Sequence, residues 1–176
     1  MTIGSDLLSD TSRVSTLRIS TIAYWIFTLM FAFEMIAGSM WDLLQIEYAR
    51  SVLTHLGYPM YLLFILGAWR LPGAVVCLVP RFPRLKEWAY AGAVFNYSGA
   101  AASHLLAGDG PKLWMAPAVF TLAALASWAL RPPDRRLAPP SPEPATRPLA
   151  WIVPIVIAAV MLVVALLTLP KGPAPV

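Results

Sequence analysis

The stretch of sequence that decides the fold is residues 58–86, YPMYLLFILGAWRLPGAVVCLVPRFPRLK. It holds an apolar run about as long as a helix that spans a bilayer, and a short basic turn follows. Arg70 lies in the middle of this run. A cationic side chain at the bilayer centre costs about 2.5–3.5 kcal/mol on insertion scales. Arg70 therefore needs a partner, a water-filled cavity or a route to the surface.

The best upstream partner for Arg70 is Glu34, which interrupts a second apolar segment, AYWIFTLMFAFEMIAGSMW, at residues 23–41. In the helices expected from these segments, the two charges differ in depth by roughly 6 Å at a rise of 1.5 Å per residue. Long side chains can bridge that separation. The sequence therefore predicts an ion pair between Glu34 and Arg70 inside the membrane.

Composition supports a membrane protein and excludes several other classes. Of the 176 residues, 59% are hydrophobic and only 12% are charged, which excludes a disordered chain and argues against a soluble domain. The net charge is +4, but the basic residues lie between apolar segments and form no stripe with interleaved aromatic residues, so we expect a lipid bilayer and no nucleic acid as partner. A single cysteine, Cys77, cannot form an intramolecular disulfide or a Cys-x-x-Cys pair.

The pattern of apolar runs predicts an all-α membrane protein, with a four-helix transmembrane bundle followed by a fifth transmembrane helix at the C-terminus. A proline-rich linker, with 7 prolines in residues 131–148, separates the two. The expected parts are a polar cytoplasmic tail at 1–17, a four-helix membrane domain at 18–130, a cytoplasmic linker at 131–148, a fifth helix at 149–169 and a tail at 170–176. The expected helices of the membrane domain are about 18–41, 59–79, 87–106 and 113–130, with a short amphipathic helix on the membrane surface within 42–57.

The distribution of Lys and Arg predicts the orientation. Outside the spans, nine lie in the N-terminal tail and in the second and fourth loops, and three lie in the other loops and the C-terminal tail. The positive-inside rule then places the N-terminus in the cytoplasm. Four polar residues are expected toward the outer face: Asp42, solvated at the rim, and His55, Tyr58 and His104.

Small and polar residues follow one face of the third expected helix. Gly92, Asn96, Gly99 and Ser103 lie within a narrow arc. Such a stripe is typical of a tight interface between membrane helices, so we expect this face to pack against a neighbour.

Several short motifs of the chain resemble the DoxX-like family of small bacterial membrane proteins. They are LGYP at 56–59, LGAWRL at 66–71, PRFPRLKEW at 80–88, and AAASH at 100–104 before GDG at 108–110. The resemblance covers about residues 20–130 and implies a four-helix bundle in the bacterial inner membrane. It also implies a link to membrane redox systems, since the family name comes from a subunit of a thiosulfate-oxidising, quinone-reducing complex. Family members often carry Lys or Glu at the position of Arg70, and the linker and fifth helix depart from the four-helix pattern.

The polar groups inside the expected bundle allow two interpretations. Glu34 and Arg70 form either a structural ion pair that neutralises two costly charges, or part of a pocket for a quinone headgroup, a small anion or a proton. Asn96 either completes that pocket or forms a hydrogen bond between helices. His55 and His104, the only histidines, make a bis-histidine haem geometrically conceivable, but no motif supports haem or a metal site.

The sequence contains no nucleophile–base arrangement, P-loop or dinucleotide fingerprint, so no catalytic residue is assigned and no catalytic activity of the chain alone is expected. Three functions follow, in order of preference. The first is a non-catalytic subunit or scaffold of a quinone-linked redox system, with a membrane-associated redox protein as partner. The second is a binder or transporter of a small molecule at Glu34 and Arg70. The third is a quinone-reactive enzyme.

Overall fold

The computed structural model describes residues 3–137 and 149–167, and within those ranges it contains helices and no strand. The chain divides into one compact unit up to Leu137 and a second unit from Ala138. The elements in chain order are α1 (Ile3–Leu43), α2 (Glu47–His55), α3 (Tyr61–Leu78), α4 (Pro83–Leu106), α5 (Pro111–Leu130), the 3-10 helix η1 (Pro133–Arg135) and α6 (Leu149–Leu167).

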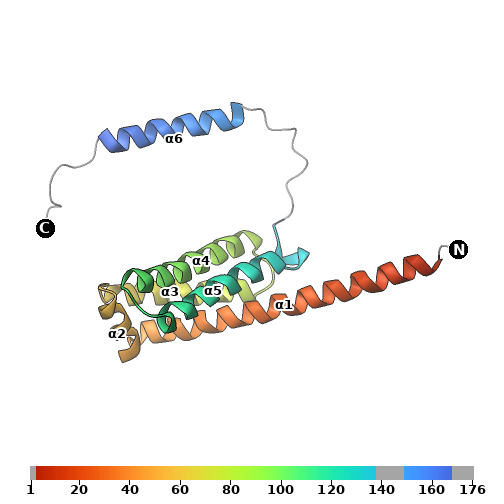
Figure 1. Ribbon diagram of the computed structural model, residues 1–176, viewed down its shortest axis with the longest axis horizontal. Coiled ribbons are helices and arrows are strands. Elements are labelled where there is room, and N and C mark those ends of the chain that lie inside the picture. The colour runs from red at the N-terminus through yellow and green to blue at the C-terminus, as the bar shows by residue number, and fades with distance from the viewer. Residues whose placement is uncertain (1–2, 138–148, 168–176) are drawn as a thin grey trace. The chain divides into compact units, whose positions relative to one another are not determined.

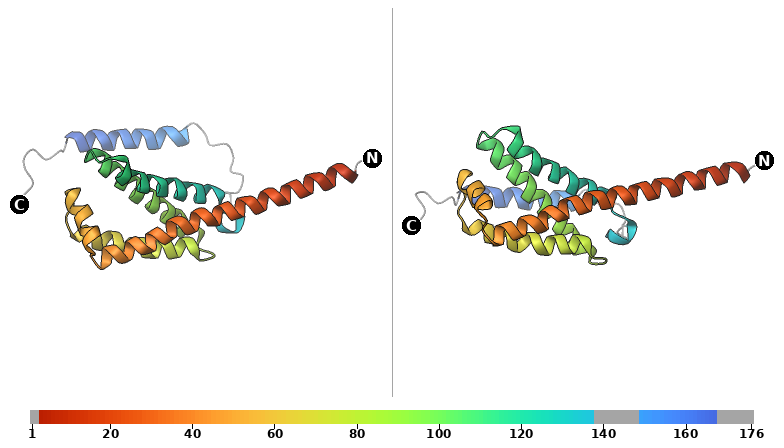
Figure 2. Two further views of the ribbon diagram at one scale, coloured as in Figure 1. Left: turned by 60° about the horizontal axis from the view of Figure 1, so that its bottom comes forward. Right: turned by 90° about the horizontal axis from the view of Figure 1, so that it is seen from below.

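Four long helices of the first unit pack into a bundle. α1 contacts α3 and α5, and α4 contacts the same two helices. The short helix α2 packs against α1. Figure 2 shows α4 and α5 diverging from α1 toward the end of the bundle that carries α2. The order of these elements along the chain can be followed by colour in Figure 1.

The helix boundaries agree in part with the sequence prediction. α3 and α5 confirm the second and fourth predicted helices to within two residues, and α6 begins at Leu149 as predicted. α1 begins at Ile3, so the segment 3–17, expected as a polar tail, lies in a helix instead. The expected linker contains η1, while its remainder at 138–148 and the expected tail at 170–176 lie outside the described residues.

Three described helices are long and apolar enough to cross a membrane: Arg18–Leu43 within α1, Tyr61–Leu78 and Pro111–Leu130. α4, the third predicted span, mixes its apolar residues with polar ones such as Asn96, Ser103 and His104.

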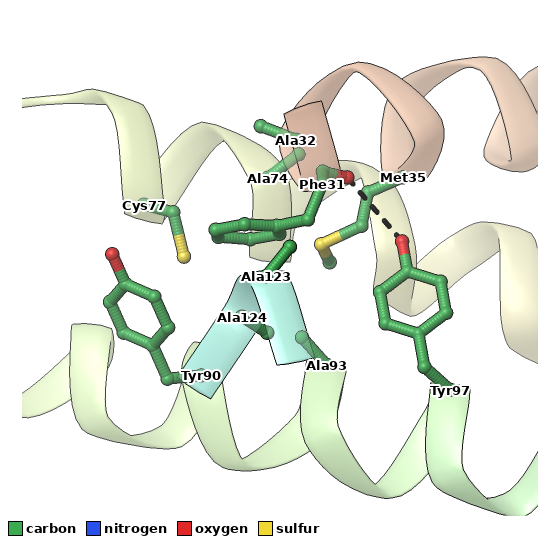
Figure 3. Close-up of a cluster of buried hydrophobic side chains, with 10 residues drawn as sticks. All are labelled: Phe31, Ala32, Met35, Ala74, Cys77, Tyr90, Ala93, Tyr97, Ala123 and Ala124. Atoms are coloured by element: carbon green, nitrogen blue, oxygen red, sulfur yellow. Dashed lines mark hydrogen bonds between the residues drawn. The ribbon is translucent and has the colours of Figure 1, made fainter. Parts of the chain in front are cut away.

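The core lies where all four long helices meet. Phe31 and Met35 of α1 pack against Tyr90 and Tyr97 of α4, and alanines from α1, α3, α4 and α5 fill the space between them (Figure 3). The inward face of α3 carries Leu63, Gly67, Ala74 and Cys77, all of which are buried. Small residues let the helices approach while the tyrosine rings fill the remaining volume.

The stripe expected to pack on a neighbouring helix does not do so. A Cβ built at Gly92 or Gly99 would meet nothing within 4 Å, and both glycines are exposed. The buried face of α4 instead carries Tyr90 and Tyr97. The prediction was wrong because small residues either admit a neighbouring helix or leave space beside it, and the sequence does not distinguish the two.

A hydrogen-bonded group of hydroxyls joins three helices in the core. Ser127 Oγ of α5 lies 2.6 Å from Thr28 Oγ1 of α1 and 2.8 Å from the Tyr90 hydroxyl of α4. Thr28 also donates to the Tyr24 carbonyl at 2.7 Å. The side chains of Thr28, Tyr90 and Ser127 are buried, so leaving one of their hydroxyls without a partner would lower the free energy of unfolding.

The basic turn expected before the third helix is also different in the structure. α4 begins at Pro83, since proline suits the first position of a helix, and Lys86 therefore lies in its first turn. Lys86 is fully buried, and its Nζ donates hydrogen bonds to three backbone carbonyls at the end of α3, those of Val76, Cys77 and Val79. Arg135 Nη1 donates to a fourth, that of Leu78, at 3.2 Å. The two cations satisfy carbonyls that a helix C-terminus leaves free.

Candidate functional site: a cavity beside a buried ion-pair cluster

The ion pair predicted within the membrane is present and has a third member. Arg70 Nη2 of α3 lies 3.3 Å from Glu34 Oε1 of α1, and Arg70 Nη1 lies 3.1 Å from Asp42 Oδ2. Asp42 is only 6% exposed, so the prediction that it is solvated at the rim was wrong. One guanidinium therefore bridges two carboxylates, and we call Glu34, Asp42 and Arg70 the ion-pair cluster.

A glycine makes room for the guanidinium. Glu34, Gly38 and Asp42 follow one another at intervals of four residues, so they lie along one side of α1. A Cβ at Gly38 would collide with Arg70 Nη1 and would meet Glu34 Oε1 at 3.0 Å. The missing side chain lets Arg70 lie flat against α1 between the two carboxylates.

The backbones of α1 and α3 also approach closely beside the cluster. Ser39 Oγ donates a hydrogen bond of 2.7 Å to the Gly67 carbonyl. A Cβ at Gly67 would come within 2.7 Å of Leu43 Cγ and 3.1 Å of the Ser39 carbonyl oxygen. This contact fixes the distance between the two helices that supply the charges.

Tyr97 of α4 completes the surroundings of the cluster. Its hydroxyl donates a hydrogen bond to Glu34 Oε2, and its ring lies 5.8 Å from Arg70 Cζ. The same hydroxyl is 3.4 Å from the Phe31 carbonyl, as Figure 3 shows. Sequence reasoning did not identify Tyr97. The available signal was a tyrosine one position from Asn96 on a membrane helix, where a buried hydroxyl needs a partner.

A cavity of about 640 Å³ lies against the cluster. Its walls come from α1, α2, α3, α4 and α5, and most of the side chains that line it are apolar or aromatic. Glu34, Asp42 and Arg70 all contribute to the lining. A cavity of this size with a few polar groups in apolar walls is typical of a small-molecule site.

The small residues of α4 border this cavity. Asn96, Gly99 and Ser103 line it, which explains why that face of α4 has no helix packed on it. Asn96 is half-buried, and its side chain has no hydrogen bond to any residue in 3–137 or 149–167. Of the two roles expected for Asn96, the structure places it in the cavity wall.

The four residues expected at the outer face are distributed around the end of the bundle that carries α2. Asp42 belongs to the ion-pair cluster, Tyr58 and His104 line the cavity, and His55 is not part of the lining. The Tyr58 hydroxyl is 2.8 Å from Ser103 Oγ, which joins the segment after α2 to α4. His55, at the end of α2, contacts the loop between α4 and α5.

That loop contact is a group of two histidines and one aspartate. Asp109 Oδ1 lies 2.7 Å from His55 Nε2, and Asp109 Oδ2 lies 2.6 Å from His104 Nδ1. The hydrogen bond with His104 and then that with His55 lower the pKa of Asp109 from its usual value of 3.8. The sequence did not reveal this group, because His55 is 54 residues from Asp109 in the chain.

In the described part of the chain, no group of side chains is arranged to bind a metal ion, and the one thiol lies away from the cavity. No set of three or more His, Cys, Asp or Glu side chains in residues 3–137 and 149–167 is placed to hold a metal ion. Cys77 is a buried free thiol in the core cluster and does not line the cavity.

The family model of the DoxX-like family matches residues 26–127. The chain belongs to the DoxX-like family. The matched segment runs from within α1 to within α5, so the DoxX-like core contains the ion-pair cluster, Asn96 and Tyr97, while α6 lies beyond it. No curated protein and no solved structure matches the chain.

Proposed function

We propose that this DoxX-like protein is a multi-pass protein of the bacterial inner membrane whose core crosses the bilayer four times, through α1, α3, α4 and α5, with residues 149–169 as a fifth span. Three of these helices are candidate spans, and α4 packs between two of them. The polar residues of α4 border the cavity, so they need not meet lipid. The excess of Lys and Arg in the tail and in the second and fourth loops supports a cytoplasmic N-terminus.

We further propose that the cavity binds a small amphipathic molecule whose polar end faces the ion-pair cluster. The observation that carries this proposal is the open volume of about 640 Å³ directly against Glu34, Asp42 and Arg70. A purely structural ion pair needs no open volume beside it, because protein interiors are normally close-packed and leave few voids larger than a water molecule. Space kept beside charged groups within a membrane domain instead favours a binding or transport site.

The role of a non-catalytic subunit in a quinone-linked redox system is a compatible proposal. It is supported by the family, whose name comes from such a complex, and by the cavity, which has room for a quinone headgroup at its polar end. The lone thiol, Cys77, is in the core and not at the cavity. A bound quinone would therefore exchange electrons with a partner protein and not with a side chain of this chain.

Purification from native membranes in a gentle detergent, followed by mass spectrometry and an optical spectrum, tests these proposals. We expect a small amphipathic molecule to be recovered with the wild-type protein and to be reduced or absent with Glu34→Gln. The matched control is Glu47→Gln, because Glu47 is an exposed acid of α2 that does not line the cavity. A co-purifying flavoprotein or haem protein would support the redox-subunit role. Equal recovery of every molecule from both variants would contradict binding at the cluster.

A further inference from the structure

The charges at the polar end of the cavity do not balance. Within residues 3–137 and 149–167, Arg70 is the one cation that contacts Glu34 and Asp42, so the ion-pair cluster carries one more carboxylate than it has cations. Lys112, the other cation of the lining, is exposed in the first turn of α5, where water solvates it. His104 is engaged with Asp109. The buried end of the cavity is therefore acidic by one charge when both carboxyl groups are ionised.

This excess charge lies in surroundings that favour a cation. A carboxylate held away from water is costly unless a positive charge or a proton neutralises it. The cavity leaves room for a positive charge beside Glu34 and Asp42. Its wall also carries six aromatic residues: Phe33, Trp41, Tyr48, Tyr58, Tyr97 and Phe120. Aromatic rings attract cations through their π-faces, most strongly where water is excluded.

We infer that the cavity takes lipophilic organic cations, with the positive charge near Glu34 and Asp42 and the apolar groups against the aromatic and aliphatic walls. This inference rests on the proposed function, because it names the ligand class for the same cavity. The inference excludes anions such as fatty carboxylates as ligands, because they would add negative charge to a cluster that already carries an excess carboxylate. Arg70 does not offset this, since both of its terminal nitrogens already contact carboxylates.

Two ions of the same shape and opposite charge test the inference. Tetraphenylphosphonium and tetraphenylborate are each titrated against wild type and Glu34→Gln in the same micelles, with binding measured by equilibrium dialysis. The partition of each probe into detergent cancels when one protein is compared with another. Glu34→Gln balances the cluster, since Asp42 still pairs with Arg70, so it should weaken tetraphenylphosphonium binding about tenfold, or about 1.4 kcal/mol. Tetraphenylborate binding should strengthen or stay unchanged.

Two further variants and a measurement of folding distinguish a change in ligand affinity from a loss of folded protein. Glu34→Gln/Asp42→Asn leaves Arg70 as an unbalanced cation, so the preference should reverse toward tetraphenylborate. Glu47→Gln changes the same net charge outside the cavity and should leave both affinities at the wild-type values. Thermal unfolding of each variant in the same detergent shows whether it is folded before binding is compared.

The outcomes distinguish the inference from the function on which it rests. If both probes bind and Glu34→Gln changes their affinities equally, the cavity is a binding site but the proposed ligand class is wrong. This result is expected if a proton already neutralises the second carboxylate. If neither ion binds, and the neutral probe triphenylmethanol does not bind either, both the inference and the proposed function are overturned. Binding of the phosphonium that is weakened by Glu34→Gln and unchanged by Glu47→Gln supports both.

Discussion

Replacing Arg70 with methionine tests the ion-pair cluster most severely. Methionine keeps much of the apolar volume of the side chain but leaves two carboxylates without a cation. The Glu34 and Asp42 side chains are 22% and 9% exposed, so water reaches them only through the cavity. Removing one partner of a buried pair costs about 3–5 kcal/mol, and we expect Arg70→Met to lower the free energy of unfolding by that amount.

Restoring charge balance should recover the loss. Glu34→Gln/Arg70→Met still leaves Asp42 alone, so we expect it to recover only about half of the lost stability. The triple variant Glu34→Gln/Asp42→Asn/Arg70→Met contains no unbalanced charge, and we expect it to lie within about 1 kcal/mol of wild type, since a buried ion pair replaced as a whole is close to neutral. A Gln at position 34 can still accept the hydrogen bond of Tyr97.

The assay is unfolding in mixed micelles with increasing SDS, followed by the fluorescence of the seven tryptophans. The midpoint and slope of each unfolding curve give the free energy of unfolding of that variant. The variants together form a mutant cycle. The reasoning is refuted if Arg70→Met lies within about 0.5 kcal/mol of wild type, or if the triple variant is no more stable than Arg70→Met alone.

Three further predictions concern other parts of the bundle. Lys86→Met should cost about 2 kcal/mol in the same assay, because it removes a buried donor from carbonyls at the end of α3. Gly38→Ala should cost about 1–3 kcal/mol because its Cβ displaces Arg70, whereas Gly92→Ala should cost nothing, since open space surrounds it. The pKa of Asp109 is lowered from 3.8, so its contribution to stability is present above pH 3.8 and is lost as the pH falls through the lowered value. The difference in melting temperature between wild type and Asp109→Asn should therefore shrink as the pH falls below 3.8.

Each of these predictions has a distinct contrary result. A stable Lys86→Met protein would mean that Arg135 alone satisfies the end of α3. Equal stabilities of Gly38→Ala and Gly92→Ala would show that Arg70 has space to move. A pH-independent difference for Asp109→Asn would mean that the carboxylate does not depend on its histidine partners.

The sequence predicted the contacts that follow from the high free-energy cost of an unpaired charge inside an apolar segment. An arginine and a glutamate inside apolar segments each need a partner, so the contact between Arg70 and Glu34 could be inferred without a structure. Helix boundaries near prolines could be inferred from the local sequence. The start of α6 at Leu149 was predicted directly, and the start of α3 at Tyr61 was predicted to within two residues. These inferences depend on the local sequence or on a charge that few positions can neutralise.

The remaining features depend on geometry that the sequence does not carry. Asp42 was interpreted as solvated because it follows the expected end of the span, although Glu34, Gly38 and Asp42 at intervals of four residues were a signal that the guanidinium lies between two acids. Lys86 was interpreted as part of a loop because its partners are backbone carbonyls of another helix. The contact between Asp109 and His55 could not be inferred, because the two residues are distant in the chain.

An experimental density map of the protein extracted from its own membranes in a mild detergent would test most directly whether the cavity holds a ligand against the ion-pair cluster. We expect an elongated feature that fills the cavity between α1 and α4, with its polar end within hydrogen-bonding or ion-pairing distance of Glu34 or Asp42. A cavity that contains only water, or one closed by α4 packed directly against α1, would contradict the proposed binding site.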